Sequence, residues 1–195
     1  MTAAIHAPLQ PRRDNDAYYT PDALAHACIG AIACPTPRLV VEPSVGGGAF
    51  ARAVHIRWAA AFVTGVDINP DAPGFTSCDH AVHAPWSHDT AEDIRLSAGA
   101  RVDMIVGNPP YQGAEEHVLV ALDAAPVVGM LLRLGWLAGQ KRRSTIWNRH
   151  PPAAVHVLSR RPSFTGGGTD ASEYAFYVWD RARYDGDTFL TWLDW

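Results

Sequence analysis

Two consecutive prolines directly after an apolar run force a turn at one defined point of this chain. Residues 102–107 have the apolar pattern of a buried strand. Pro109 and Pro110 can neither extend that strand nor begin a helix comfortably. The turn at residues 108–111 therefore places an amide side chain, a proline carbonyl and an aromatic ring at the carboxyl end of the strand. Open α/β sheets bind their ligands at that edge.

Strand and helix patterns alternate along most of the chain. Apolar runs predict strands at residues 38–42, 61–68, 75–78, 102–107, 127–134, 153–158 and 174–179. Between them, helices are predicted to start at Thr20-Pro21-Asp22, with Thr20 as N-cap, and to span residues 49–60, 91–96 and 114–125. This alternation predicts an α/β fold with a doubly wound, mostly parallel seven-stranded sheet. A loop alone joins the last two of these strands, which predicts an antiparallel edge hairpin, and residues 188–192 have the pattern of a further strand.

The composition favours one folded domain over residues 1–195. Hydrophobic residues make up 48% and charged residues 18% of the chain, as in globular proteins. Residues 1–17 are polar and irregular, and we expect a mobile lead-in there. No apolar run approaches the roughly 20 residues that span a bilayer, so no membrane partner is expected. The three scattered cysteines suit a reducing cytoplasm. Whether the chain forms oligomers is left open.

A glycine-rich segment follows an early strand. Residues 42–50 read Glu-Pro-Ser-Val-Gly-Gly-Gly-Ala-Phe and predict a strand, a glycine turn and the start of a helix. The last glycine of a dinucleotide fingerprint is missing, because Ala51 stands there, so an ordinary tight turn is the alternative. Asp67 ends the next predicted strand and suits either ribose hydroxyls or the start of a turn. Asp79 follows the third predicted strand and suits an adenine amino group.

Three motifs in this order resemble those of S-adenosylmethionine-dependent DNA amino-methyltransferases, in particular adenine-N6 enzymes with the gamma arrangement. Residues 18–21, Tyr-Tyr-Thr-Pro, look like the N-terminal cofactor motif. Residues 42–50 look like the glycine motif, and residues 108–111, Asn-Pro-Pro-Tyr, look like the catalytic motif. The resemblance covers about residues 18–180. It implies a class I methyltransferase (Rossmann-like) fold, S-adenosyl-L-methionine as cofactor and DNA as partner.

The resemblance also implies roles for individual residues. The implied cofactor-binding residues are Tyr19, Thr20, Glu42, Pro43, Ser44, Gly46, Gly48, Phe50, Asp67, Ile68, Asp79 and Asn108. The implied catalytic residues are Asn108, Pro109, Pro110 and Tyr111. Asn108 and the carbonyl of Pro109 would accept hydrogen bonds from the target amino group, and Tyr111 would stack on a base flipped out of the duplex. Phe164 would close the other face of the base pocket.

The chain departs from the family pattern in its length. Most sequence-specific members carry a separate target-recognition region, whereas here the catalytic core takes nearly the whole chain. We therefore expect low or short sequence specificity, as in short bacteriophage enzymes, and a place in the cytoplasm of a bacterial or phage-infected cell. The alternatives are an RNA or protein-glutamine methyltransferase, a cytosine-N4 DNA methyltransferase, in which serine or aspartate is more usual at position 108, and an inactive nucleic-acid-binding module.

Two further clusters of side chains are weaker signals. Lys141, Arg142 and Arg143 lie between Trp136 and Trp147, which suits either DNA-backbone contacts or a solvated surface. The cysteine and histidines at positions 78, 80, 83 and 88 match no common zinc spacing, and we expect no metal site.

Overall fold

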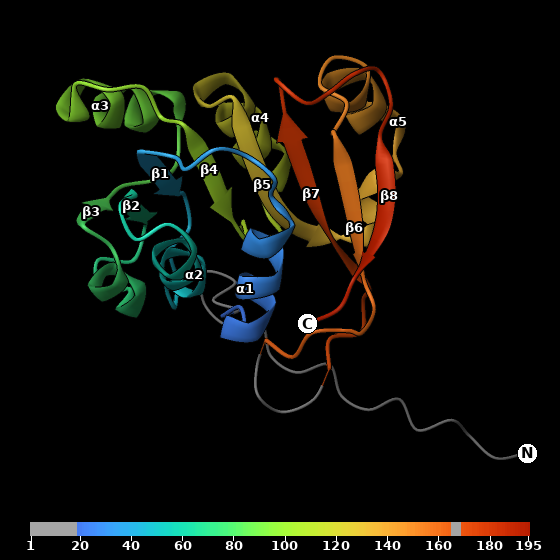
Figure 1. Cartoon of the computed structure of the whole chain (residues 1–195), viewed down its shortest axis with the longest axis horizontal. Coiled ribbons are helices and arrows are strands. Elements are labelled where there is room, and N and C mark those ends of the chain that lie inside the picture. Colours follow the sequence, from blue (N-terminus) through green and yellow to red (C-terminus); the bar gives the residue numbers. More distant parts are fainter. Residues whose placement is uncertain (1–18, 165–168) are drawn as a thin grey trace, which may run out of the picture.

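The computed structural model describes residues 19–164 and 169–195, which form an eight-stranded sheet. In chain order the strands are β1 (Leu39–Glu42), β2 (Phe62–Asp67), β3 (His80–His83), β4 (Met104–Gly107), β5 (Val127–Arg133), β6 (Ala154–Leu158), β7 (Tyr174–Asp180) and β8 (Phe189–Leu193). Their order across the sheet is β3-β2-β1-β4-β5-β7-β6-β8 (Figure 1). The lead-in expected at residues 1–17 lies outside the described residues.

The predicted doubly wound, mostly parallel sheet is confirmed. β1 pairs in parallel with β2 and with β4, and β2–β3, β4–β5 and β6–β8 are parallel pairs as well. β7 runs antiparallel to both β5 and β6, so the predicted antiparallel pair is present. The sheet has one strand more than the expected seven, because the segment predicted as a further strand pairs with β6 as β8 and takes the edge position.

Helices cover both faces of the sheet. α1 (Asp22–Ala31) and α2 (Ala49–Arg57) pack with one face of the strands into one apolar cluster. α3 (His88–Ala98), α4 (Ala114–Ala124) and the turn η4 (Arg143–Trp147) belong to the cluster on the other face. Figure 1 shows α4 and the short helix α5 (Gln140–Arg142) behind the strands. None of the helices in the described residues is long and apolar enough to cross a membrane.

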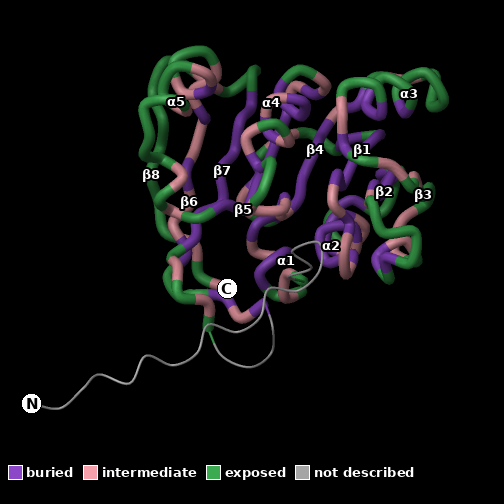
Figure 2. Tube along the Cα trace, turned by 180° about the vertical axis from the view of Figure 1, so that it is seen from behind, coloured by how far each residue is buried: buried purple, intermediate pink, exposed green. Residues whose placement is uncertain are grey.

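Burial follows the position of each strand in the sheet. The strands β1, β4 and β7 are buried throughout, whereas β3 and β8 at the two edges are mostly exposed (Figure 2). A strand with helices on both of its faces carries apolar side chains on both faces. The continuous apolar runs that predicted the central strands arise from this double cover.

The third strand is displaced from its predicted position. Residues 75–78, predicted as a strand, lie in and directly after the 3₁₀ helix η2 (Pro73–Ser77). β3 begins only at His80. Pro73 opens the helical turn, which suits the fixed φ of proline. Because β3 is an exposed edge strand with histidine at both ends, it lacks the apolar run by which the other strands were predicted.

We predict that Gly129→Ala destabilises the sheet. A β-carbon on Gly129, in the middle of β5, would lie 2.6 Å from Cζ of Phe176 and 3.1 Å from Cδ1 of Ile32. Both of these side chains are fully buried and have no room to retreat. Overpacking of this kind costs about 1–3 kcal/mol, and urea denaturation would measure the loss of unfolding free energy. Gly135→Ala is the matched control, since a β-carbon there meets no atom within 4 Å; an equal loss in both variants would contradict the prediction.

Candidate active site

A cavity of about 450 Å³ lies where the loops after β1, β2, β3 and β4 meet. These loops and the start of α4 supply its walls, together with Tyr19 from the segment before α1. The lining residues are Tyr19, Pro43, Ser44, Gly46, Asp67, Ile68, Asn69, Ala72, Ala84, Pro85, Trp86, Ser87, Asn108, Pro109, Pro110, Tyr111, Gly113, Glu116 and His117. The cavity thus lies at the carboxyl edge of the parallel strands, as expected for an open α/β sheet.

The glycine turn after β1 packs backbone against backbone. Gly46 and Gly48 have positive φ angles of 45° and 75°. A β-carbon on Gly48 would lie 2.8 Å from Cα of Gly74 in η2, so only glycine fits there. Gly46 lines the cavity, but Gly48 faces η2. Phe50 is 1% exposed and stacks on Phe176 in the core. Gly48 and Phe50 were both predicted to contact the cofactor. Gly48 instead packs against η2 and Phe50 packs in the core, and neither lines the cavity.

Two acidic side chains hold this turn and the start of α2 in place. Glu42, which is 3% exposed, accepts a hydrogen bond from the backbone N–H of Ala51 at 2.8 Å. Burial raises the pKa of Glu42 well above its ordinary value, although this hydrogen bond works in the opposite direction. Asp67 accepts the N–H of Gly46 at 2.9 Å on one oxygen and the N–H of Asn69 at 2.9 Å on the other. Because each carboxylate oxygen has two lone pairs, Asp67 at the cavity wall retains capacity for a ligand hydroxyl.

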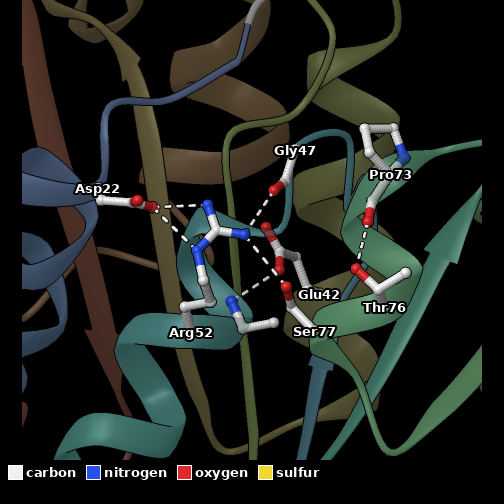
Figure 3. Close-up of polar contacts among 8 residues, drawn as sticks. Asp22, Glu42, Gly47, Arg52, Pro73, Thr76 and Ser77 are labelled. Carbon is white, nitrogen blue, oxygen red and sulfur yellow. Dashed lines mark hydrogen bonds and ion pairs between the residues drawn. The ribbon is translucent and has the colours of Figure 1, made fainter.

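Arg52 of α2 ties the turn to two neighbouring elements (Figure 3). Its guanidinium donates to the carboxylate of Asp22 in α1 at 2.6 Å and to the carbonyl of Gly47 at 2.7 Å. It also donates to the hydroxyl of Ser77 in η2 at 3.1 Å. Charge-assisted hydrogen bonds of this kind are among the stronger ones. Arg52 therefore fixes the carbonyl side of the turn, a role that helix periodicity does not indicate.

The N-terminal motif contacts both halves of the site. A β-carbon on Gly47 would lie 3.1 Å from Cγ of Tyr19, so the Tyr19 ring lies against the glycine turn. The sequence predicts Thr20 as the N-cap of α1, but Pro21 occupies that position and no side chain caps the helix. The Thr20 hydroxyl instead accepts a hydrogen bond from Nδ2 of Asn108 at 3.2 Å. A residue type that is favoured at helix caps is used here to orient the amide.

The four residues after β4 all line the cavity. Because Nδ2 of Asn108 donates to Thr20, Oδ1 is the amide atom that can accept a hydrogen bond. The hydroxyl of Tyr111 lies 2.5 Å from that of Tyr174, and the guanidinium carbon of Arg133 lies 4.1 Å from the centre of the Tyr111 ring. Burial raises the pKa of Tyr111. The structure thus brings the predicted catalytic motif and the glycine turn to one cavity.

Two predicted contacts lie elsewhere. Asp79 precedes β3 instead of following the third strand, and its carboxylate accepts the N–H of Val63 at 2.7 Å and lies 3.5 Å from Nε2 of His55. Val63 is near the start of β2, so Asp79 lies at the amino ends of the strands, at the opposite end from the cavity. Phe164 is 6% exposed and packs edge to face on Tyr174 with ring centres 5.1 Å apart. It belongs to the core and does not line the cavity.

The basic cluster is largely engaged within the chain. Arg142 donates to the carbonyl of Trp136 at 2.8 Å and also to the carbonyl of Ala138. Lys141 pairs with Glu115 of α4 at 3.1 Å. Arg143 is exposed. Arg142 therefore holds the segment after β5 in place, and this cluster is a weaker candidate for DNA contacts than the sequence indicates.

Sequence reasoning missed the wall formed by the loop after β3. Trp86, which is largely buried, donates from Nε1 to the carbonyl of His117 at 3.2 Å and so links this loop to α4. Burial lowers the pKa of His117. Trp86 was missed because the third strand was predicted at the wrong position. A strand predicted at residues 80–83 would have placed Trp86 at the carboxyl edge of the sheet. Within the described ranges, no group of three or more His, Cys, Asp or Glu residues is placed to hold a metal ion.

Comparison with known proteins identifies the fold. No protein-family model matches the sequence, and no curated protein matches it significantly. Among solved structures, the methyltransferase subunit of a type I restriction-modification system from Streptococcus thermophilus aligns with a TM-score of 0.71 at 13% identity, over 90% of this chain. This chain spans 47% of that subunit, about half of its length.

Two smaller enzymes align over most of the chain as well. An O-methyltransferase from Bacillus cereus, solved in complex with SAH, has a TM-score of 0.61 at 12% identity and covers 86% of this chain and 85% of its own. A putative class I S-adenosylmethionine-dependent methyltransferase from Listeria monocytogenes has a TM-score of 0.58 at 10% identity, over 94% of this chain and 66% of its own. The chain has the class I methyltransferase fold.

We predict that Glu42 makes the stability of the protein depend on pH. Its pKa is raised in the folded state above the ordinary value of 4.5, so its contribution to stability is complete below that value and is lost as pH rises through the folded pKa. Glu42→Gln keeps an acceptor for the N–H of Ala51 and cannot ionise. The unfolding free energy of the parent protein, relative to this variant, should therefore fall between pH 5 and pH 8 in urea titrations. A rise over the same interval would show that the helix N–H groups favour the carboxylate form.

Proposed function

We propose that the chain is an S-adenosylmethionine-dependent methyltransferase that methylates the exocyclic N6 of adenine in DNA. One observation carries the proposal: the Asn108 amide, held through Nδ2 by Thr20, lines the same cavity of about 450 Å³ as the turn residue Gly46. A site for an amino group and a site for a nucleoside cofactor are therefore contiguous.

The residues around the glycine turn fit this cofactor. Gly46 offers a close backbone approach, and Asp67 offers a carboxylate for ribose hydroxyls at the end of β2. The side chains of Ile68 and Trp86 supply apolar walls suited to a purine. S-adenosylmethionine supplies an electrophilic methyl group when bound. The Bacillus cereus neighbour of the same fold was solved with the related SAH, which supports this choice of cofactor.

The catalytic motif suits an amino group conjugated with an aromatic ring. The lone pair of such a nitrogen is delocalised, so the nitrogen is a weak nucleophile. Oδ1 of Asn108 and the carbonyl of Pro109 can accept hydrogen bonds from its two protons. Both acceptors favour tetrahedral nitrogen and stabilise the positive charge that develops there. A strong base is not required, because the methylated nitrogen is acidic and releases its proton readily.

A base within a duplex must leave the stack to reach this cavity. Tyr111 lines the cavity beside Asn108 and offers a ring on which a flipped base can stack. The Streptococcus thermophilus neighbour, a subunit of a restriction-modification system, supports DNA as the substrate. The test is methyl transfer from labelled S-adenosylmethionine to genomic DNA, total RNA and a protein extract in parallel. N6-methyladenine in digested DNA supports the proposal, whereas label in RNA or protein alone would overturn the substrate.

Asn108→Ala should abolish methyl transfer and leave the cofactor bound. Removing one preorganised hydrogen-bonding group from a transition state costs about 100-fold or more in kcat. Calorimetric titration should give a Kd for S-adenosylmethionine close to that of the parent protein. Asn148→Ala, at an exposed position, is the control for the substitution itself. Collapse of cofactor binding in Asn108→Ala would contradict the division of the cavity into two sites.

Asp67→Asn should weaken cofactor binding and largely spare the methyl-transfer step, the reverse of what is expected for Asn108→Ala. A hydrogen bond to a charged group is worth about 1.5–3 kcal/mol, so the Kd for S-adenosylmethionine should rise by roughly 10- to 100-fold. At saturating cofactor, kcat should largely recover. Asp71→Asn, at an exposed position in the loop that follows β2, controls for the loss of one charge. An unchanged Kd in Asp67→Asn would remove the ribose-binding role.

A further inference from the structure

Three side chains from neighbouring strands meet beside the cavity. Tyr111 follows β4, and Arg133 is the last residue of β5. Tyr174 is the first residue of β7, and the antiparallel register pairs it with Arg133. Since β7 runs against β5, its first residue lies at the edge where β4 and β5 end. This topology places the Tyr174 hydroxyl beside the catalytic motif.

The contacts among these side chains form a brace around Tyr111. The hydroxyls of Tyr111 and Tyr174 are 2.5 Å apart, and the Arg133 guanidinium carbon lies 4.1 Å from the centre of the Tyr111 ring. Nε of Arg133 donates to the Tyr174 hydroxyl at 3.5 Å. That hydroxyl donates to Asp170 at 3.3 Å, so its single proton is used and it accepts from Tyr111. The Tyr111 ring is therefore restrained both at its hydroxyl and through its face.

The brace lies outside the cavity itself. Tyr111 lines the cavity, whereas Arg133 and Tyr174 do not. Tyr174 is 1% exposed, so its side chain is held in position by the surrounding core. The guanidinium lies over the Tyr111 ring from an exposed residue at the end of β5, and Tyr111 still lines the cavity.

We propose that Arg133 and Tyr174 are positioning residues that hold the Tyr111 ring in the plane against which a flipped base stacks. The inference rests on the proposed function, in that Tyr111 contacts the base. A flexible ring loses conformational freedom when it stacks, and a ring fixed in advance does not, so the brace strengthens base binding. A planar guanidinium stacks on an aromatic face, whereas a lysine ammonium acts as a point charge. Arg133→Lys should therefore keep only part of the base binding of the parent protein.

Tyr174→Phe and Arg133→Gln test the brace. Each should lower kcat/KM for DNA by about tenfold, within the range that base stacking contributes, mainly through a higher KM. The second measurement is a fluorescence titration of a single-stranded oligonucleotide containing 2-aminopurine at saturating S-adenosylhomocysteine, which needs no methyl transfer. Its Kd should rise by a similar factor in both variants. Tyr184→Phe, which removes an exposed hydroxyl bonded to the carbonyl of Gly186, and Arg149→Gln, at an exposed position, are the matched controls.

The outcomes separate the brace from the proposed function. Weaker binding in both variants, with the Kd for S-adenosylhomocysteine and the melting temperature as in the controls, supports the brace. A lower melting temperature with unchanged oligonucleotide binding and KM would show a purely structural role and overturn it. If the parent protein binds the oligonucleotide but methylates no DNA, the proposed reaction fails, and the binding titration still decides whether the brace acts.

Discussion

The parallel pairing of β1 with β2 on one side and with β4 on the other is the constraint on which the site depends. Val40 is aligned with Val63 across one pair and with Met104 across the other. Parallel strands in register end at one edge, so the loops that follow them must converge there. This convergence brings Gly46, in the loop after β1, into hydrogen-bonding contact with Asp67 at the end of β2, although 21 positions separate them in the chain.

The edge is held together by acidic and basic side chains that are partly or wholly removed from water. Glu42 and Asp67 accept backbone N–H groups of the glycine turn and of α2, and Arg52 donates to a carbonyl of the same turn. Removing an acidic group from water is costly unless hydrogen bonds replace the lost solvent, and burial also raises the pKa of Glu42. The N–H groups at a helix start and at a glycine turn supply such bonds. Bonding of this kind also fixes the backbone in advance, which a preorganised binding site requires.

Local patterns predicted the elements that are buried on both faces and the turns whose chemistry is restrictive. Pro109 and Pro110 end a strand wherever they occur, and β4 and α4 lie where the residues around them indicate. The edge strand β3 was predicted at the wrong position, because an exposed strand needs no apolar run. For the same reason Asp79 was predicted at the carboxyl end of the third strand, whereas it precedes β3. Local patterns also do not predict the direction in which an aromatic side chain points. Phe50 is the last residue of the predicted glycine motif, yet it points into the core.

The sequence by itself determined where the chain turns, which segments alternate as strands and helices, and which residue types stand at the strand ends. These features depend on neighbouring residues, through proline geometry, glycine freedom and apolar periodicity. The tertiary structure alone decided which side chains meet. Tyr111 reaches Tyr174 across 63 positions and Tyr174 reaches Arg133 across 41, because β7 enters the sheet beside β5 in the opposite direction. That strand order depends on pairing between segments that lie far apart in the chain, which no local pattern contains.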